Sequence, residues 1–185
     1  DYILGIFSKY IAYYNDTKHI VQGIENILIM GKACGMMKLY TISDAFLNSV
    51  LKMTTLCDTS YQKILFKNLL ALKTIMSFIE ENGDYIYTSW HSIFYILSRI
   101  NQLKKCSPNL IYNICPHKKI DKKKFNENFA YNLKQVEIID YEKIYTLTSK
   151  YRIETLKQLV KDLSNVAEEE IALFKDGENR KNKER

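Results

Sequence analysis

The 185-residue chain has few of the residues on which several large classes of protein depend. It contains six glycines and two prolines, too few for a β-sandwich or barrel, which needs a turn roughly every 8–12 residues. Six scattered glycines also exclude a glycine-rich phosphate-binding loop. No apolar run approaches the roughly 18 residues that identify a transmembrane helix.

Cysteine and histidine are also scarce, with four cysteines and three histidines in the chain. The cysteines form no CxxC pair, which is typical of reduced thiols in the cytosol. Cys106, Cys115 and His117 lie near one another, but a structural zinc site needs a fourth ligand and paired spacing, so no metal site is predicted. His19 and His91 lie in separate settings without a nucleophile elbow, and we expect neither catalytic residues nor a cofactor.

Helical periodicity dominates what is present. Gly35 and Gly83 are expected to end helices, Gly83 by accepting a left-handed conformation. Successive helix pairs begin about 40 residues apart, which is typical of HEAT and armadillo repeats, although an irregular bundle gives similar apolar stripes. We predict an all-α protein, a HEAT/armadillo-like stack of helical hairpins with a basic loop insertion. Helices are expected at about 17–34, from 41 or 43 onward, at about 60–82, from 88 or 89 onward, at about 137–148 and at about 152–167.

The basic character of the chain is concentrated in residues 104–124. This stretch holds seven lysines against Asp121, a net of 7 − 1 = +6, which equals the formal charge of the whole chain. Both prolines also lie here, and together these features predict a loop. The chain does not begin with Met, and we expect it to be part of a longer protein. The predicted segments are a helical-repeat core at 1–104, a basic Lys-rich loop at 105–135, a C-terminal helical pair at 136–172 and a disordered tail at 173–185.

Three interpretations of this loop stay open. Its lysines could neutralise nucleic-acid phosphates, although the loop has no Arg and few aromatic side chains. They could equally contact an anionic membrane surface, at about 1 kcal/mol per lysine, or lie in solvent with no partner. The residues expected to make an anionic-surface contact are Lys118, Lys119, Lys122, Lys123 and Lys124.

One run of sequence resembles a known family. It comprises Lys67-Asn68-Leu69-Leu70-Ala71-Leu72-Lys73-Thr74-Ile75, then Asn82-Gly83-Asp84-Tyr85, then Thr88-Ser89-Trp90-His91-Ser92-Ile93. This run is similar to the first "homology downstream of Sec-seven" domain of the large Arf guanine-nucleotide exchange factors, the Sec-seven or BIG family. Asp84 stands where the family usually has Asn, and the 104–124 stretch has no counterpart there.

The resemblance implies a regulatory, non-catalytic segment of helical repeats, because the family's catalytic domain precedes this region. It implies GTP-loaded Arf, other domains of the parent exchange factor and an anionic membrane as partners. It also implies a cytoplasmic location, peripheral at the Golgi, trans-Golgi or endosomal membrane. The alternatives are a generic helical scaffold and nucleic-acid binding. The family-motif residues, expected to be structural or regulatory, are Lys67, Asn68, Gly83, Tyr85, Ser89, Trp90 and His91. From its place after a helix cap, Trp90 is also expected to be a buried anchor.

Overall fold

The computed structural model describes residues 2–56, 62–114 and 121–183, and all regular structure in these ranges is helical. The prediction of an all-α chain is therefore confirmed. None of these helices is long and apolar enough to cross a membrane. The helices are α1 (Tyr2–Tyr13), α2 (Thr17–Met36), α3 (Tyr40–Met53), α4 (Phe66–Asn82), α5 (Trp90–Lys105), α6 (Pro108–Ile114), α7 (Lys122–Val136), α8 (Lys143–Leu147) and α9 (Ile153–Lys183), with short 3-10 turns at Gly83–Tyr85, Tyr87–Ser89 and Thr148–Lys150.

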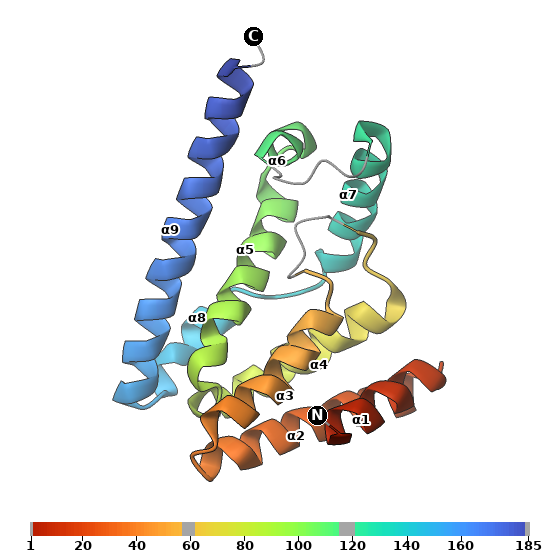
Figure 1. The fold of residues 1–185 in the computed structure, drawn as a ribbon, viewed down its shortest axis with the longest axis vertical. Helices are drawn as coiled ribbons and strands as arrows, with labels where there is room; N and C mark the ends of the chain where they lie inside the picture. Colours follow the sequence, from red (N-terminus) through yellow and green to blue (C-terminus); the bar gives the residue numbers. More distant parts are fainter. Residues whose placement is uncertain (1, 57–61, 115–120, 184–185) are drawn as a thin grey trace.

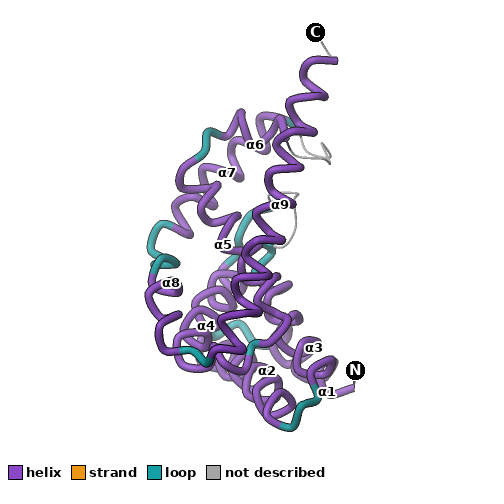
Figure 2. The backbone as a smooth tube through the Cα atoms, turned by 90° about the vertical axis from the view of Figure 1, so that its left-hand side faces the viewer, coloured by secondary structure: helices purple, strands orange, loops and turns teal. Residues whose placement is uncertain are grey.

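The helices form a base and an upright part (Figure 1). Helices α1 to α4 make up the base, and α5 rises from it with α9 running alongside. Helices α6 and α7 lie at the far end of α5. Figure 2 shows α1 to α3 on one side of the base and α8 on the opposite side. The chain therefore brings the end of α4, the start of α5 and the start of α9 to the same corner of the molecule.

The first turn of α4 ties three helices of the base together. Asn68 accepts a hydrogen bond from the Leu65 amide at 2.8 Å, which caps α4. Its amide nitrogen donates to the Met53 carbonyl at the end of α3, at 2.6 Å. The neighbouring Lys67 donates to two carbonyls in the last turn of α1, both at 3.0 Å, where a positive charge also suits the helix dipole. Both residues, chosen from the family resemblance, thus hold helix ends together.

Residues 105–135 were predicted to form a loop. Helices α6 and α7 occupy most of this range, so the prediction of a loop was wrong. Asp121 begins α7 by accepting from the Lys124 amide at 3.0 Å. Two buried phenylalanines and two buried asparagines then follow on one face of α7, while its lysines are exposed. One of these, Asn132, forms hydrogen bonds with the backbone of the segment before α4. Its side-chain oxygen accepts from the Ile64 amide at 2.8 Å, and its side-chain nitrogen donates to the Gln62 carbonyl at 2.7 Å. Lysines crowd the sequence here, but they do not prevent a helix whose other face is buried.

The C-terminal part also departs from the expectation. The helix expected at 137–148 is reduced to the five residues of α8. The tail expected to be disordered from residue 173 continues as α9 to Lys183, giving one helix of 31 residues. The reason is that residues 167–176 are mostly strong helix formers, and an established helix extends at little cost through such residues.

Candidate functional site

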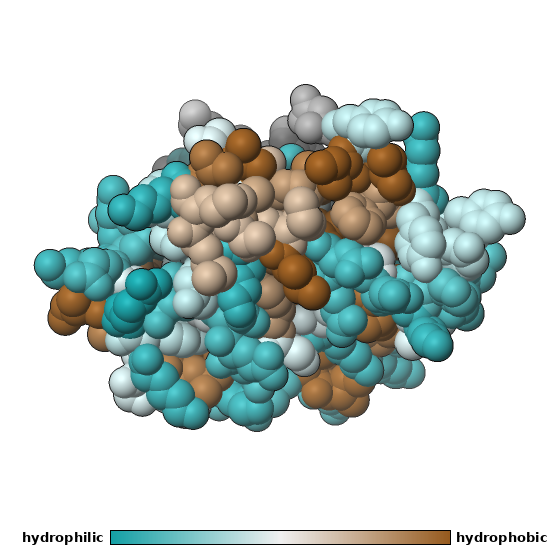
Figure 3. All heavy atoms as spheres, turned by 90° about the horizontal axis from the view of Figure 1, so that it is seen from below, coloured by the Kyte–Doolittle hydropathy of each residue, from teal (hydrophilic) through white to brown (hydrophobic). Residues whose placement is uncertain are grey.

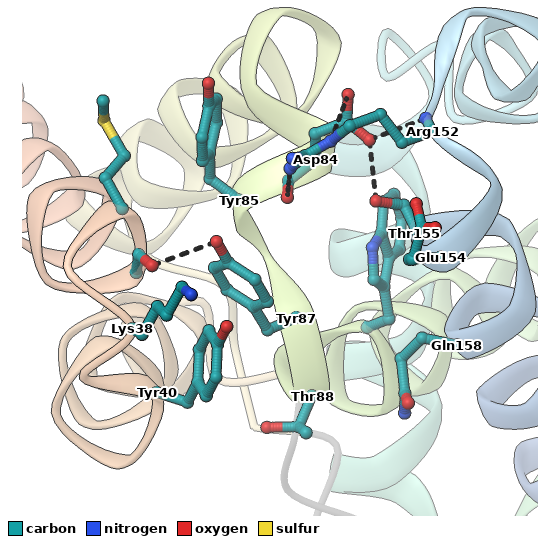
Figure 4. A pocket seen from close by; sticks show the side chains of 13 residues that line it. Lys38, Tyr40, Asp84, Tyr85, Tyr87, Thr88, Arg152, Glu154, Thr155 and Gln158 are labelled. Carbon is teal, nitrogen blue, oxygen red and sulfur yellow. Dashed lines mark hydrogen bonds and ion pairs between the residues drawn. The ribbon is translucent and has the colours of Figure 1, made fainter.

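A cavity of about 620 Å³ lies at the corner where three distant segments meet. One wall is the α2–α3 corner, a second is the link between α4 and α5, and the third is the start of α9. Figure 4 shows the side chains that enclose it. The lining residues are Gly35, Met36, Lys38, Tyr40, Asp84, Tyr85, Tyr87, Thr88, Trp90, Arg152, Glu154, Thr155 and Gln158.

Asp84 fastens the link to the first turn of α9. One of its carboxylate oxygens accepts from the Arg152 amide at 2.9 Å and from the Thr155 hydroxyl at 2.7 Å. The Arg152 guanidinium lies 3.5 Å from the other oxygen and donates to the Asp84 carbonyl at 3.0 Å. Burial raises the pKa of Asp84, but the bonds from Thr155 and Arg152 outweigh it and leave the pKa below its usual value. The carboxylate is therefore ionised and already occupied.

Tyr87 fastens the same link to α2 on the other side of the cavity. Its hydroxyl donates to the Gly35 carbonyl at 3.0 Å, and its ring lies 4.5 Å from that of Tyr40. A Cβ atom on Gly35 would lie 2.5 Å from the Tyr87 ring, so only glycine fits there. Burial, followed by the neighbouring Tyr40 hydroxyl, raises the pKa of Tyr87.

The sequence predicted that Gly35 and Gly83 end helices, and α4 does end at Asn82, directly before Gly83, but the left-handed conformation expected of Gly83 is wrong. Gly35 lies inside α2, which ends at Met36, and the left-handed residue at that corner is Lys38, with a φ of 62°. Gly83 has a φ of −53°, an ordinary helical value. Its importance is contact: a Cβ atom there would lie 2.3 Å from the Tyr151 ring. Both glycines make room for a tyrosine.

Two residues with left-handed backbone conformations line the cavity next to each other (Figure 4). Lys38 and Tyr87 adopt left-handed backbone conformations, with φ of 62° and 49°, and Thr55 is the only other non-glycine residue that does so in the described ranges. Such conformations cost about 1–3 kcal/mol each and gather at functional sites. Lys38 and Tyr40 reach the cavity from the α2–α3 corner and Tyr87 from the link (Figure 4). Two of the three left-handed residues in the described ranges therefore lie in the wall of this cavity.

Trp90 anchors the cavity from inside the protein. Its side chain is completely buried, as expected, against the rings of Phe94 at 5.6 Å and Tyr151 at 5.8 Å. Its indole N–H is buried and finds no hydrogen-bond acceptor among residues 2–56, 62–114 and 121–183. A buried donor without an acceptor costs about 1–3 kcal/mol, so this N–H lowers the free energy of unfolding of the protein.

Two of the seven family-motif residues, Tyr85 and Trp90, line this cavity. Tyr85 lines it, with the ammonium of Lys32 at 5.2 Å and the guanidinium of Arg152 at 5.6 Å from its ring centroid. Ser89 donates to Asp44 of α3 at 2.7 Å and so holds the link against the base. His91 does not line the cavity. Its Nε2 lies 3.1 Å from a carboxylate oxygen of Glu169 on the surface of α9.

No pattern in the sequence predicted a role for four of the lining residues, Lys38, Tyr40, Tyr87 and Arg152. One signal did point to this arrangement. Asp84 departs from the family's usual Asn, and the acidic side chain is the one that pairs with Arg152. The partner lies 68 positions away, so it could not be identified from spacing along the chain.

The remaining sequence candidates lie elsewhere. Lys122, Lys123 and Lys124 are exposed in the first turn of α7, at the other end of α5 from the cavity (Figure 1). Lys118 and Lys119 lie outside the described residues, as do Cys115 and His117. Within the described ranges, no group of three or more His, Cys, Asp or Glu side chains is placed to hold a metal ion. Cys106 is a free thiol whose pKa is raised by burial and then by Glu170.

Comparisons with protein families, with curated proteins and with solved structures find no match to this chain.

Proposed function

We propose that the chain is a non-catalytic regulatory segment of a large Arf guanine-nucleotide exchange factor. In this proposal it contacts GTP-loaded Arf at a Golgi, trans-Golgi or endosomal membrane. The observation that supports it is that the link carrying the family-motif run forms one wall of the cavity. Gly83, Tyr85, Ser89 and Trp90 lie in or beside one link, and this link forms a wall of the cavity. These four residues are near neighbours in the sequence, and two of them, Tyr85 and Trp90, line the cavity itself.

The chemistry of the cavity suits binding better than catalysis. Asp84 is held by Arg152 and Thr155, so its oxygens are not available as a general base. The other groups are mainly aromatic rings and amphipathic side chains, which are typical of protein contact sites. Lys38 and Tyr40 are exposed at the rim, where a partner would meet them first.

The wider architecture and membrane contact belong to the same proposal. The hairpins of the base would be part of a HEAT/armadillo-like stack that continues into other domains of the parent exchange factor. The exposed Lys122, Lys123 and Lys124 would face an anionic membrane surface, and the cavity at the opposite end of α5 would remain open to Arf.

The test is capture of Arf on anionic liposomes by the chain, comparing GTP-loaded with GDP-loaded Arf. The cavity variant is Lys38→Glu, and the matched control is Lys161→Glu, the same change at an exposed position of α9. We expect GTP-selective capture by the wild-type chain and by the control, and a loss of at least about tenfold in affinity for the cavity variant.

Three outcomes would contradict the proposal. The absence of capture would favour a helical scaffold. Equal capture of both nucleotide states would remove the regulatory role. Binding of RNA that weakens steeply with salt, without capture of Arf, would favour the nucleic-acid alternative.

A further inference from the structure

The side chains that α9 buries and those that it exposes are neighbours in the sequence. Among residues 153–176, the buried side chains are Leu159, Asp162, Val166 and Glu170. Each is followed directly by an exposed apolar residue, and these four are Val160, Leu163, Ala167 and Ile171. The three large ones are between 39% and 61% exposed. Two of the four buried residues are thus acids, whereas all four residues that follow them are apolar.

Exposed apolar side chains alone are not unusual in this molecule. The underside of the base carries several of them among polar ones (Figure 3). Apolar residues scattered over a surface need no special explanation. Those of α9 differ because they repeat the spacing of the buried face, displaced by one residue.

A helix is symmetrical under a step of one residue. A rotation of about 100° with a slide of about 1.5 Å places each residue where the preceding one was, and the helical backbone coincides with itself. After this step, α9 would bury four apolar side chains in the places of two apolar ones and two acids. Asp162 and Glu170 would take the exposed places of Lys161 and Glu169. The displaced residue would be accommodated before α9, where Thr148–Lys150 forms a single 3-10 turn.

We propose that α9 has two packing registers on α5, one residue apart, and that the contact between Arg99 and Glu170 selects the register of this structure. Arg99 is buried on α5, and its guanidinium lies 3.5 Å from one carboxylate oxygen of Glu170. The side-chain nitrogen of Gln102 donates to the other oxygen. Separating a buried pair of charges is costly, so the pair opposes the step. This inference does not rest on the function proposed above.

The contact between His91 and α9 does not select a register. The His91 Nε2 lies 3.1 Å from a carboxylate oxygen of Glu169, and the step would bring Glu170 into the same place. His91 would therefore keep a carboxylate in either register, whereas Arg99 would meet Ile171 in place of Glu170. Selection of one register is the best-attested role of a buried polar or charged contact between helices.

The second register also has costs. Lys157 and Lys175 would take the half-buried places of Leu156 and Phe174, and Val166 would become exposed. Long lysine side chains can extend from such places to solvent. The gain at the buried positions is thus partly offset, which keeps the two registers close enough in stability for one contact to decide between them.

The register of α9 also determines one wall of the cavity. Arg152 and Thr155 hold the Asp84 carboxylate in the present register. After the step, Ile153 and Leu156 would take their places, and neither side chain can donate a hydrogen bond. A ligand that enters the cavity and displaces Arg152 or Thr155 from Asp84 would therefore favour the second register.

The test measures thiol labelling at two neighbouring positions of α9 in the whole chain. Val166→Cys places a thiol at a position that is buried in the present register, and Ala167→Cys places one at an exposed position. The second register exchanges these two environments. Mass spectrometry of the tryptic peptide 162–175 reports the labelling, because this peptide contains no cysteine of its own.

Arg99→Met removes the buried charge, and Glu169→Gln is the matched control on the exposed side. In the wild-type background and in the control, Ala167→Cys should label at least about tenfold faster than Val166→Cys, since a minor state is about 10% populated or less. With Arg99→Met, Val166→Cys should label faster than Ala167→Cys. Adding Asp162→Leu should restore the original order, because leucine favours the buried place that the aspartate now occupies.

Three results with Arg99→Met would overturn the inference. Equal labelling at both positions would show that α9 has come loose rather than changed register. An unchanged order would show that the charge pair does not select the register, and so would an order that Asp162→Leu does not restore. If circular dichroism shows that Arg99→Met is unfolded, Asp84→Asn replaces it, since it loosens the other end of α9. The excess labelling of Ala167→Cys should then fall at least about fivefold, and an unchanged ratio would overturn the inference.

Discussion

The Tyr151 ring occupies the space where a side chain on Gly83 would lie. A Cβ atom built on Gly83 would be 2.3 Å from Cζ of Tyr151, whose hydroxyl donates to the Ile79 carbonyl at 3.2 Å. Burial, then the charges of Asp84 and Glu80, raise the pKa of this hydroxyl to about 12, so it stays protonated at neutral pH. The end of α4 and the segment just before α9 thus pack so closely that a methyl group on Gly83 does not fit.

Gly83→Ala should therefore destabilise the protein by about 1–3 kcal/mol, as overpacking does. The backbone of Gly83 is ordinary, so contact alone produces the loss. The control is Gly5→Ala in α1, where a Cβ atom meets no atom within 4 Å and alanine should add about 0.5–1 kcal/mol. Urea unfolding measures both, and equal stability of the two variants would contradict the tight contact.

Trp90→Ala should cost about 3–5 kcal/mol, because it empties a completely buried site. Trp90→Phe should cost clearly less, about 1–3 kcal/mol, because the lost indole N–H has no acceptor in the described part of the protein. Chemical denaturation followed by circular dichroism gives both values. A phenylalanine variant as unstable as the alanine variant would indicate that the N–H does have a partner.

Asp84→Asn should weaken the protein by about 1–3 kcal/mol at neutral pH, because bonds to a charged carboxylate are lost. The pKa of Asp84 is lower in the folded state, so the charge contributes stability above the unfolded pKa. This contribution disappears as the pH falls through the folded-state pKa. The stability difference between wild type and variant should thus shrink below about pH 4, measured by unfolding at several pH values.

A difference that stays constant down to pH 2 would contradict the role of the Asp84 charge. Asp140→Asn is the matched control, since Asp140 is exposed in the segment after α7. That variant should have the stability of the wild type at neutral pH, because no hydrogen-bonded carboxylate is replaced.

Lys38→Gly should stabilise the protein slightly, by about 0.5 kcal/mol. Relief of the left-handed backbone gains about 1–2 kcal/mol, and the flexibility of glycine in the unfolded chain removes part of it. At an exposed helical position, Lys73→Gly in α4 should instead lose about 1 kcal/mol. Thermal unfolding measures both changes. A higher unfolding temperature for Lys38→Gly and a lower one for Lys73→Gly would support strain at Lys38, and equal decreases would contradict it.

Lys67→Met should loosen α1 rather than the whole protein. The ammonium donates to two carbonyls of the last turn of α1, and methionine keeps the apolar stem without these bonds. We expect faster amide hydrogen exchange in α1 and little change in α5. Lys73→Met, at an exposed position of the same helix, should leave both unchanged. If Lys67→Met changed the exchange rate in α1 no more than in the other helices, α1 would not depend on this contact.

Apolar periodicity was enough to predict α2, α3, α4 and α5, because their buried stripes consist of aliphatic and aromatic residues, whereas α1, with one buried side chain, was not predicted. It failed for α7, where Asn128 and Asn132 occupy buried positions of the stripe and the surrounding lysines suggested a loop. A buried asparagine is satisfied by backbone groups about 70 positions away, which local patterns do not contain. The same limit applied to the cavity, since Asp84 could be noticed as a departure, but Arg152 could not be paired with it.

The family resemblance selected residues that matter without saying why they do. Lys67 and Asn68 join helix ends, Gly83 makes room for a ring, and Ser89 anchors the link to α3. Each role depends on a partner from another helix. Sequence spacing placed the residues on the right elements, and only the packed structure supplied their partners.

The length of α9 has a mechanical consequence. Its 31 residues extend about 46 Å at a rise of 1.5 Å per residue, and its first turn is held by Asp84 at the cavity. A tilt of about 10° around that turn would move the far end by about 8 Å. Because α9 also packs along α5 and against α6, a rearrangement of Asp84 and its two partners would move the far end only if these contacts shifted with it.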